Sequence, residues 1–354
     1  MTKDCQDPLE LPKPLSTLAI GSVPFDSAQQ ALDLMSGTLD IPAHPQLVSL
    51  SPWEDMLLSA SSGFPALAVD SENNLSVTTA NREEAMANFY EQFFSKDLSF
   101  LALDPKSSAG FEAFLARAGS DPQFGSRFLK SQVIGPITFG QMVRVEGANN
   151  LVDDPALLEI ASLAMGGRAA WAASRIRALG RQPVVFLDEP GLTGYGSAFS
   201  TLTPETVIST LERAVNAARQ NGPVLVGCHV CGNTDWSLLT KVGLDIINFD
   251  AYEYLSTICL YPGPIGTFLE EGGFLAWGVV PTREFDSSIS ARQLADLIRS
   301  GWSTLAAKGV NLKLLKERTL LTSACGLGRL TEEQAQGILQ ILPKVASILT
   351  TDLG

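Results

Sequence analysis

The sequence predicts a single (β/α)8 barrel, an α/β fold in which eight parallel strands form a central ring surrounded by helices. Two observations favour this fold. Short apolar runs alternate with amphipathic helical segments five times in the second half of the chain, and such alternation requires parallel strands joined by crossover helices. Acidic, histidine and cysteine side chains also follow directly after the apolar runs, where barrel enzymes place their active sites.

An open, doubly wound sheet is the alternative fold, because it uses the same alternation of strands and helices. No glycine-rich phosphate loop follows any early strand, so the barrel is preferred. The chain contains no repeat and no linker rich in proline, glycine and serine. We therefore expect residues 1–354 to form one domain.

Five apolar, largely β-branched runs are expected to be the strands of the second half. Segments with helical periodicity separate them, and two of these open with good capping residues, Thr203-Pro204-Glu205 and Thr331-Glu332-Glu333. The expected strands are 183–187, 224–227, 245–249, 274–280 and 318–322, and the expected helices are 203–220, one from about 235, 263–271, 290–308 and 331–349.

The first half gives fewer clear signals. Residues 18–21 and 128–134 are expected strands, and residues 157–179 are an expected helix. Residues 41–119 show no clear period, so no strand is assigned there.

Composition limits the classes of partner. Lysine and arginine number 25 against 38 aspartates and glutamates, a net charge of −13, and this acidic balance disfavours a nucleic-acid partner. The longest apolar runs, such as 274–281, are too short to span a membrane. The N-terminus is polar and lacks the apolar core of a signal peptide, so we expect a cytoplasmic protein. Five cysteines, an odd number, favour metal or redox chemistry over disulfides.

The most informative motif is His229-Val230-Cys231. Residues two apart on a strand face the same side, so the imidazole and the thiol can converge on one atom. A His-x-Cys pair can also arise by chance in a chain of this length. Cys325 and Glu253 follow other expected strands of the same barrel face, and zinc binds this mixture of nitrogen, sulfur and carboxylate ligands. The combination favours a zinc site.

Asp188 and Glu189 follow the strand 183–187. Adjacent residues on a strand point to opposite faces, so the two carboxylates are not expected to flank one bond as in a glycosidase. One interpretation is that one of them faces the pocket and binds an ammonium group; the other is a solvated strand end. Cys228 faces away from His229 and is expected in the core, and His44 is given no role.

In their order and spacing, several motifs resemble the catalytic domain of cobalamin-independent methionine synthase. That family is related to the methylcobamide:coenzyme M methyltransferases and to uroporphyrinogen decarboxylase. The matching pieces span most of the chain and are Ile20-Gly21-Ser22, Gly135-Pro136-Ile137-Thr138, Asp188-Glu189-Pro190, His229-Val230-Cys231-Gly232, Glu253 and Ser323-Ala324-Cys325-Gly326.

The resemblance implies a methyltransferase that methylates the thiol of L-homocysteine to give methionine. A zinc ion would bind the thiol and lower its pKa, so that a thiolate exists at neutral pH. Asp188 would bind the amino group of homocysteine, and a second acidic residue would come from the neighbourhood of Asp70 and Glu72. The implied zinc ligands are His229, Cys231, Glu253 and Cys325, and the implied carboxylate site is Ile20, Gly21 and Ser22.

Two departures from the family bear on the methyl donor. The full-length synthases carry a second, N-terminal barrel that helps to bind the folate, and this chain has no room for one. The family also has an acid histidine after the seventh strand, whereas residues 278–284 contain none, and the only histidines are His44 and His229. A folate amine needs a proton to leave, but cob(I)alamin does not. We therefore expect a stand-alone, core form of the synthase with no protein general acid. Its donor would be a methylated corrinoid such as methylcobalamin, loosely bound and carried on a corrinoid protein.

Other functions remain open. The nearest alternative keeps the zinc-bound thiolate but uses coenzyme M or another small thiol as acceptor. A uroporphyrinogen decarboxylase is disfavoured, because that family uses an arginine-rich N-terminal segment and residues 1–40 contain no arginine. A corrinoid- or zinc-binding module without activity is the third possibility.

Overall fold

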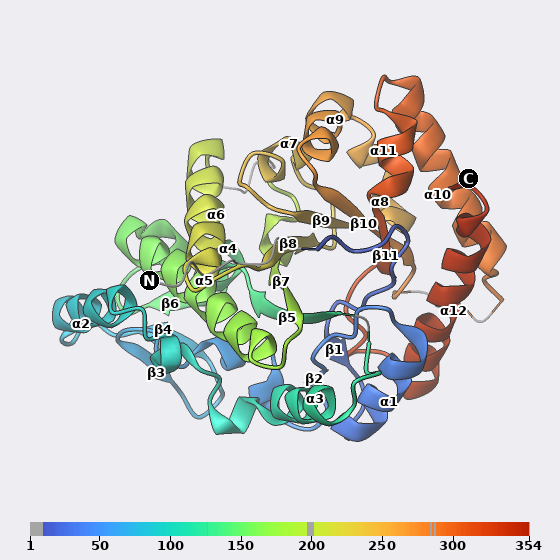
Figure 1. Cartoon of the computed structure of the whole chain (residues 1–354). Helices are drawn as coiled ribbons and strands as arrows, with labels where there is room; N and C mark the ends of the chain where they lie inside the picture. The colour runs from blue at the N-terminus through green and yellow to red at the C-terminus, as the bar shows by residue number, and fades with distance from the viewer. Residues whose placement is uncertain (1–9, 126, 197–201, 284, 287, 354) are drawn as a thin grey trace, which may run out of the picture.

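A computed structural model describes residues 10–125, 127–196, 202–283, 285–286 and 288–353. At its centre, six parallel strands form one sheet in the order β11-β10-β9-β8-β7-β5. Helices lie around the outside of this sheet (Figure 1). The strands are β5 (Phe128–Ile134), β7 (Gln182–Asp188), β8 (Leu225–Val230), β9 (Ile246–Asp250), β10 (Phe274–Val280) and β11 (Thr319–Ser323).

The predicted alternation of strands and helices in the second half is confirmed. The expected caps are present, since Thr203 accepts a hydrogen bond from the backbone N–H of Thr206 and Thr331 forms a capping box with Gln334. The helices that follow the central strands are α5 (Pro155–Arg177), α6 (Pro204–Arg219), α7 (Trp236–Leu239), α8 (Ala251–Ile258), α9 (Pro262–Glu270), α10 (Ala291–Ala307), α11 (Leu312–Glu317) and α12 (Glu332–Thr350).

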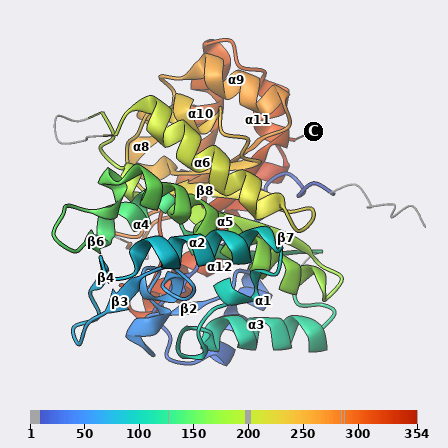
Figure 2. The same ribbon diagram turned by 90° about the vertical axis from the view of Figure 1, so that its left-hand side faces the viewer.

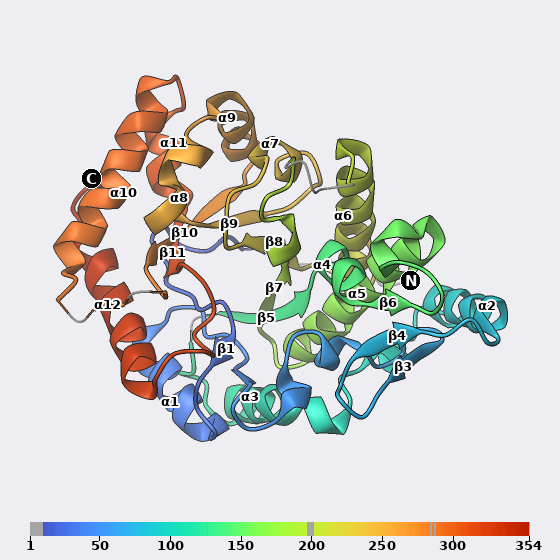
Figure 3. The ribbon, with the colours of Figure 1, turned by 180° about the vertical axis from the view of Figure 1, so that it is seen from behind.

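Short extended segments from the N-terminal part lie between the two edges of the sheet. β1 (Ser22–Val23) pairs in parallel with β2 (Gln46–Leu47). Isolated parallel bridges link Thr17 to Leu321 of β11, Leu18 to Ile41, and Ala43 to Lys130 of β5. In Figure 3 these segments are seen between β11 and β5. The strand expected at 18–21 is therefore replaced by bridges and by the short β1.

Residues 41–119, for which no strand was predicted, lie mainly to one side of the central sheet. They include β3 (Leu67–Val69), which pairs antiparallel with β4 (Leu75–Val77), and β4 pairs in parallel with β6 (Arg144–Val145). Figure 2 shows this small sheet and the neighbouring helices on the face turned toward the viewer. The remaining helices are α1 (Ala28–Thr38), α2 (Arg82–Phe94), α3 (Ala109–Ser120) and α4 (Pro136–Met142).

One face of the central sheet packs against the helices, and the other encloses a compact apolar cluster that includes Phe128, Phe186 and Phe274. Lys130 of β5 is fully buried beside this cluster, with its Nζ 4.5 Å from the centre of the Phe186 ring. Its ammonium group donates hydrogen bonds to the carbonyl of Ile20 and to Oε1 of Gln132. Within the described part of the chain, no helix is both long enough and apolar enough for a membrane span.

Candidate functional site

A pocket of about 670 Å³ lies where the central strands end, lined by the loops that follow them. Because these strands are parallel, their carboxyl ends meet on one side of the sheet. Most of the residues singled out in the sequence line this pocket, namely Ile20, Ser22, Asp188, His229, Cys231 and Cys325.

Three potential metal ligands converge in the pocket. His229 and Cys231 come from the end of β8 and its loop, and Cys325 comes from the loop after β11. The ligand atoms of these three residues all lie within 4.8 Å of one another. One imidazole nitrogen with two thiols is a donor set that zinc prefers.

Asn248 of β9 fixes the orientation of the His229 ring. The amide nitrogen of Asn248 donates to the carbonyl of Ala276 and to the hydroxyl of Thr322, at 2.8 Å in each case. The amide oxygen therefore faces His229 and accepts a hydrogen bond from Nδ1. This contact places the ring proton on Nδ1 and leaves the lone pair on Nε2. Nε2 is buried and has no hydrogen-bond partner among the described residues, as expected of a nitrogen that binds a metal.

The two thiols influence each other's ionisation. A hydrogen bond from Cys325 lowers the pKa of Cys231. The same hydrogen bond, together with burial, raises the pKa of Cys325 to about 12. The proton is therefore held more tightly by Cys325 than by Cys231, and a divalent metal ion would stabilise both groups as thiolates. The residues present thus fit a zinc ion by their donor types and by the unpartnered Nε2.

Asp188, the last residue of β7, presents a carboxylate to the pocket. It is 6% exposed, and its buried Oδ1 has no hydrogen-bond partner among the described residues. Burial raises the pKa of Asp188, an effect opposed by the charges of Lys130 and His229. Burial also lowers the pKa of Lys130 to about 8. A buried carboxylate with a free oxygen can accept charge-assisted hydrogen bonds from an ammonium group.

Glu189 points away from Asp188, as the alternation along a strand predicts. Its carboxylate accepts hydrogen bonds from the backbone N–H groups of Ile137 and Thr138 and from the Thr138 hydroxyl. Burial raises the pKa of Glu189 to about 7. Glu189 therefore anchors the start of α4 rather than facing the pocket.

Ile20 and Ser22 also line the pocket, and Gly21 lies between them in the chain. Gly21 has φ +151°, and a Cβ atom there would lie only 2.3 Å from the side chain of Gln132. A side chain at this position would have to displace the Gln132 amide and adopt a backbone φ that residues other than glycine rarely adopt.

Glu253 is not brought to the three ligands in this structure. It lies in the first turn of α8, its side chain is 37% exposed, and its carboxylate is 3.6 Å from the guanidinium of Arg283. Asp250, the last residue of β9, lines the pocket instead. Its carboxylate caps α8 by accepting from the backbone N–H of Glu253 at 2.9 Å, and burial raises the pKa of Asp250 to about 6. Asp250 was not among the predicted site residues, although it follows directly after the expected strand 245–249.

Asp70 and Glu72 are exposed in the turn between β3 and β4. Asp70 accepts hydrogen bonds from the backbone N–H groups of Glu72 and Asn74, so it stabilises the turn. Neither residue is among those that line the pocket. Cys228 is buried in the core, as expected.

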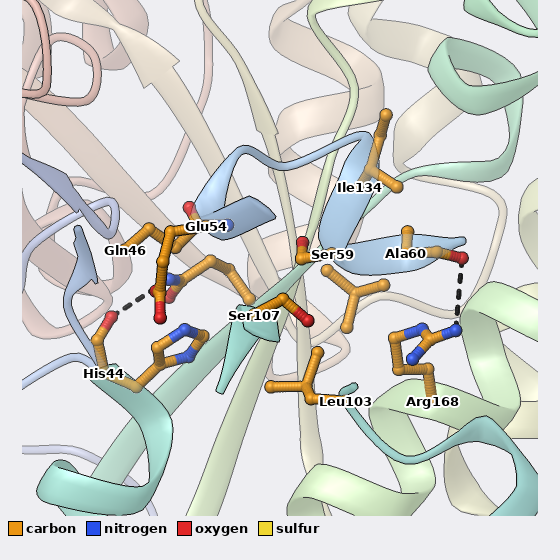
Figure 4. Close-up of a pocket in the computed structure, with 11 residues that line it drawn as sticks. His44, Gln46, Glu54, Ser59, Ala60, Leu103, Ser107, Ile134 and Arg168 are labelled. Carbon is orange, nitrogen blue, oxygen red and sulfur yellow. Dashed lines mark hydrogen bonds between the residues drawn. The ribbon is translucent and has the colours of Figure 1, made fainter. Parts of the chain in front are cut away.

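A second cavity, of about 10 Å³, lies beside the sheet and is lined in part by His44, Glu54 and Arg168 (Figure 4). This volume holds about one water molecule. The carboxylate of Glu54 accepts from the backbone N–H of Gly110, and Arg168 donates to the carbonyl of Ala60. Burial and the charge of Lys130 lower the pKa of His44 to about 3. These hydrogen bonds support the fold, although the buried Nε of Arg168 has no hydrogen-bond partner among the described residues.

No protein-family model and no curated protein sequence matches this chain. Among solved structures, it is similar to a B12-independent methionine synthase from Shewanella sp. W3-18-1 in complex with selenomethionine. The match covers 96% of this chain and 99% of the other, with 16% identity and a TM-score of 0.58. A GH5_18 protein from Streptomyces cattleya in complex with GlcNAc matches over 96% and 80% of the two chains, with 11% identity and a TM-score of 0.48. The first likeness shows a shared fold, and the second is too weak to support a conclusion.

Proposed function

We propose that the protein is a zinc-dependent methyltransferase that methylates the thiol of L-homocysteine to give methionine. The observation that carries the proposal is the convergence of His229, Cys231 and Cys325 beside the unpartnered carboxylate of Asp188. The fold shared with a methionine synthase over nearly the whole chain supports it. In this proposal, residues 17–23 and 41–47 take the places of the first two strands and complete an eight-stranded barrel.

His229, Cys231 and Cys325 would hold the metal, and a carboxylate would complete the set. The resemblance implies Glu253, which would have to leave Arg283 in order to reach the other ligands. Asp250 lines the pocket and is a second candidate, although its carboxylate, like that of Glu253, lies outside the cluster of ligand atoms. When bound, zinc lowers the pKa of a coordinated thiol, so that the substrate can react as a thiolate.

The remaining pocket residues would bind and orient the amino acid. Asp188 accepts hydrogen bonds from the ammonium group, because it lines the pocket and one oxygen of its carboxylate has no partner among the described residues. The segment Ile20 to Ser22 receives the carboxylate. Holding both ends of the substrate fixes the direction of its sulfur, which lowers the entropic part of the barrier to methyl transfer.

The proposed methyl donor is a methylated corrinoid, delivered by a corrinoid protein. The substrate sulfur attacks the methyl carbon, the carbon–cobalt bond breaks, and its electron pair remains on the cobalt as cob(I)alamin. No proton is needed by this leaving group. Neither histidine is placed to supply one, since His229 belongs to the ligand cluster and His44 is 4% exposed in the small cavity beside the sheet.

The test measures the demethylation of methylcobalamin by its change in absorbance, with homocysteine or coenzyme M as the methyl acceptor. Methyl-folate is tested in parallel as the methyl donor, and the zinc content of the protein is measured. Turnover of methylcobalamin with homocysteine, and none from methyl-folate, supports the proposal. Turnover with coenzyme M alone moves the protein to the other branch of zinc-dependent thiol methyltransferases, because coenzyme M has no amino group for Asp188 to bind. A protein that takes up no zinc contradicts both versions.

A further inference from the structure

Arg329 stands out among the charged residues of the main pocket. It lies in the loop between β11 and α12, is exposed, and lines the same pocket as His229 and Asp188. Across the described ranges, no hydrogen bond or ion pair involves its side chain. The other guanidinium of the pocket, that of Arg283, is 3.6 Å from the carboxylate of Glu253. In a chain of net charge −13, an arginine without an acidic partner is available to an anionic ligand.

The loop that carries Arg329 is fixed against Ser22. The backbone N–H of Leu327 donates to the carbonyl of Ser22 at 2.8 Å, and that of Gly328 donates to its hydroxyl at 3.4 Å. A Cβ atom on Gly326 would lie 2.2 Å from the Ser22 hydroxyl. Arg329 therefore starts from an anchored backbone beside the wall formed by Ile20 and Ser22.

The pocket thus offers three kinds of recognition. The cluster of His229, Cys231 and Cys325 suits a soft donor bound through a metal, Asp188 suits a cation, and Arg329 suits an anion. A ligand that complements all three carries a thiol, an ammonium group and an acid group. We propose that Arg329 binds the acid group of the acceptor together with the Ile20–Ser22 segment and supplies the charge that determines specificity, so that the pocket selects a zwitterionic amino-acid thiol. This inference rests on the proposed function and names the residue that recognises one end of its substrate.

The test compares two thiols that differ only in the acid group, L-homocysteine and 3-aminopropanethiol. Kinetics with methylcobalamin are measured for the wild-type chain, Arg329→Gln and Arg329→Lys, each with its zinc content determined. We expect Arg329→Gln to raise the KM for homocysteine by about ten- to hundredfold, the effect of losing a charge-assisted hydrogen bond. The KM for 3-aminopropanethiol and the zinc content should not change, and Arg329→Lys should recover part of the loss.

Arg283→Gln is the matched control, because it removes the other arginine of the pocket, the one that already has an acidic partner. It should leave the ratio of the two KM values unchanged. The inference is overturned if Arg329→Gln affects both thiols equally or affects neither.

Equilibrium binding of both thiols to the zinc-loaded protein, without a methyl donor, separates the two proposals. If homocysteine binds more tightly than 3-aminopropanethiol, and Arg329→Gln abolishes the difference, the inference holds even when no methyl is transferred. In that case only the proposed reaction fails. If the wild-type chain binds both thiols equally, or neither, the inference about Arg329 is wrong.

Discussion

The amide oxygen of Asn248 accepts the Nδ1 proton of His229 because both hydrogens of the Asn248 amide are used elsewhere. The two residues are paired across β8 and β9, so the sheet itself sets the direction of the imidazole. The amide thus acts as an outer partner of the ligand cluster, a kind of contact that tunes metal affinity in many sites.

Replacing Asn248 should therefore weaken metal binding without removing a ligand. We expect Asn248→Ala to lower the zinc affinity by about ten- to hundredfold, because the His229 ring loses the contact that fixes its tautomer. The zinc affinity is measured by competition with a chromogenic chelator. Thr322→Val, which removes only one acceptor of the amide, should have a smaller effect. An unchanged zinc affinity in Asn248→Ala would contradict this role.

Cys325 should be essential for the metal. Its thiol is one of three clustered ligand groups, so Cys325→Ala should lose most of the bound zinc and methyl transfer together. Metal analysis of the purified variant and the demethylation assay check this expectation. Cys259→Ala is the control, because Cys259 is buried in the apolar core. Cys325 would be excluded from the site if its alanine variant kept full zinc and full activity.

Asp250 and Glu253 can be distinguished by conservative amides. Asp250→Asn should reduce the zinc affinity by about tenfold or more, whereas Glu253→Gln should leave it close to wild type. Asparagine caps helices as well as aspartate does, so Asp250→Asn keeps the cap on α8 and isolates the effect of the charge. Zinc titrations of both variants provide the measurement. If Glu253→Gln lowered the zinc affinity and Asp250→Asn did not, Glu253 would be the oxygen ligand.

His44 should make the fold sensitive to acid. Its pKa is about 3 in the folded protein because the ring is buried near Lys130, against about 6.5 in an unfolded chain. Between these values only the unfolded state binds the proton, so His44 reduces stability as the pH falls. The slope is about 1.4 kcal/mol per pH unit. Glu189 and Asp250 contribute slopes of the opposite sign, because burial raises their pKa values to about 7 and about 6. The contribution of His44 is therefore measured as the difference between the wild type and His44→Gln in urea unfolding at pH 6, 5 and 4, where the wild type should lose more stability as the pH falls. Equal pH dependence of the two proteins would contradict the assignment.

The sequence was sufficient to predict the strands and helices of the second half, because apolar runs, caps and helical periods agree there. It also indicated that the side chains of His229 and Cys231 face the same side, since this depends only on the alternation of side chains between the two faces of a strand. The position of Cys325 beside these two residues depends on the order of the strands in the sheet. No local sequence pattern determines that order, although the order of the motifs along the chain supported the prediction.

No local sequence pattern determines where the Glu253 carboxylate points. Glu253 was predicted as a ligand because it follows an expected strand of the same barrel face and because the resemblance implies it, but its orientation depends on where β9 ends. β9 runs to Asp250, and α8 begins at the next residue, which turns Glu253 toward Arg283. The side sheet was missed for a related reason: its strands are two or three residues long, too short to show a period.

The contact between Ser22 and the loop at residues 326–328 has a consequence for biosynthesis. Ser22 and Gly328 are 306 residues apart in the sequence, so a ribosome must add all of the residues between them before they can meet. A nascent chain that has emerged only as far as β9 already carries His229 and Cys231 but lacks Cys325. The cluster of His229, Cys231 and Cys325 can therefore assemble only after β11 and the loop that follows it have been synthesised.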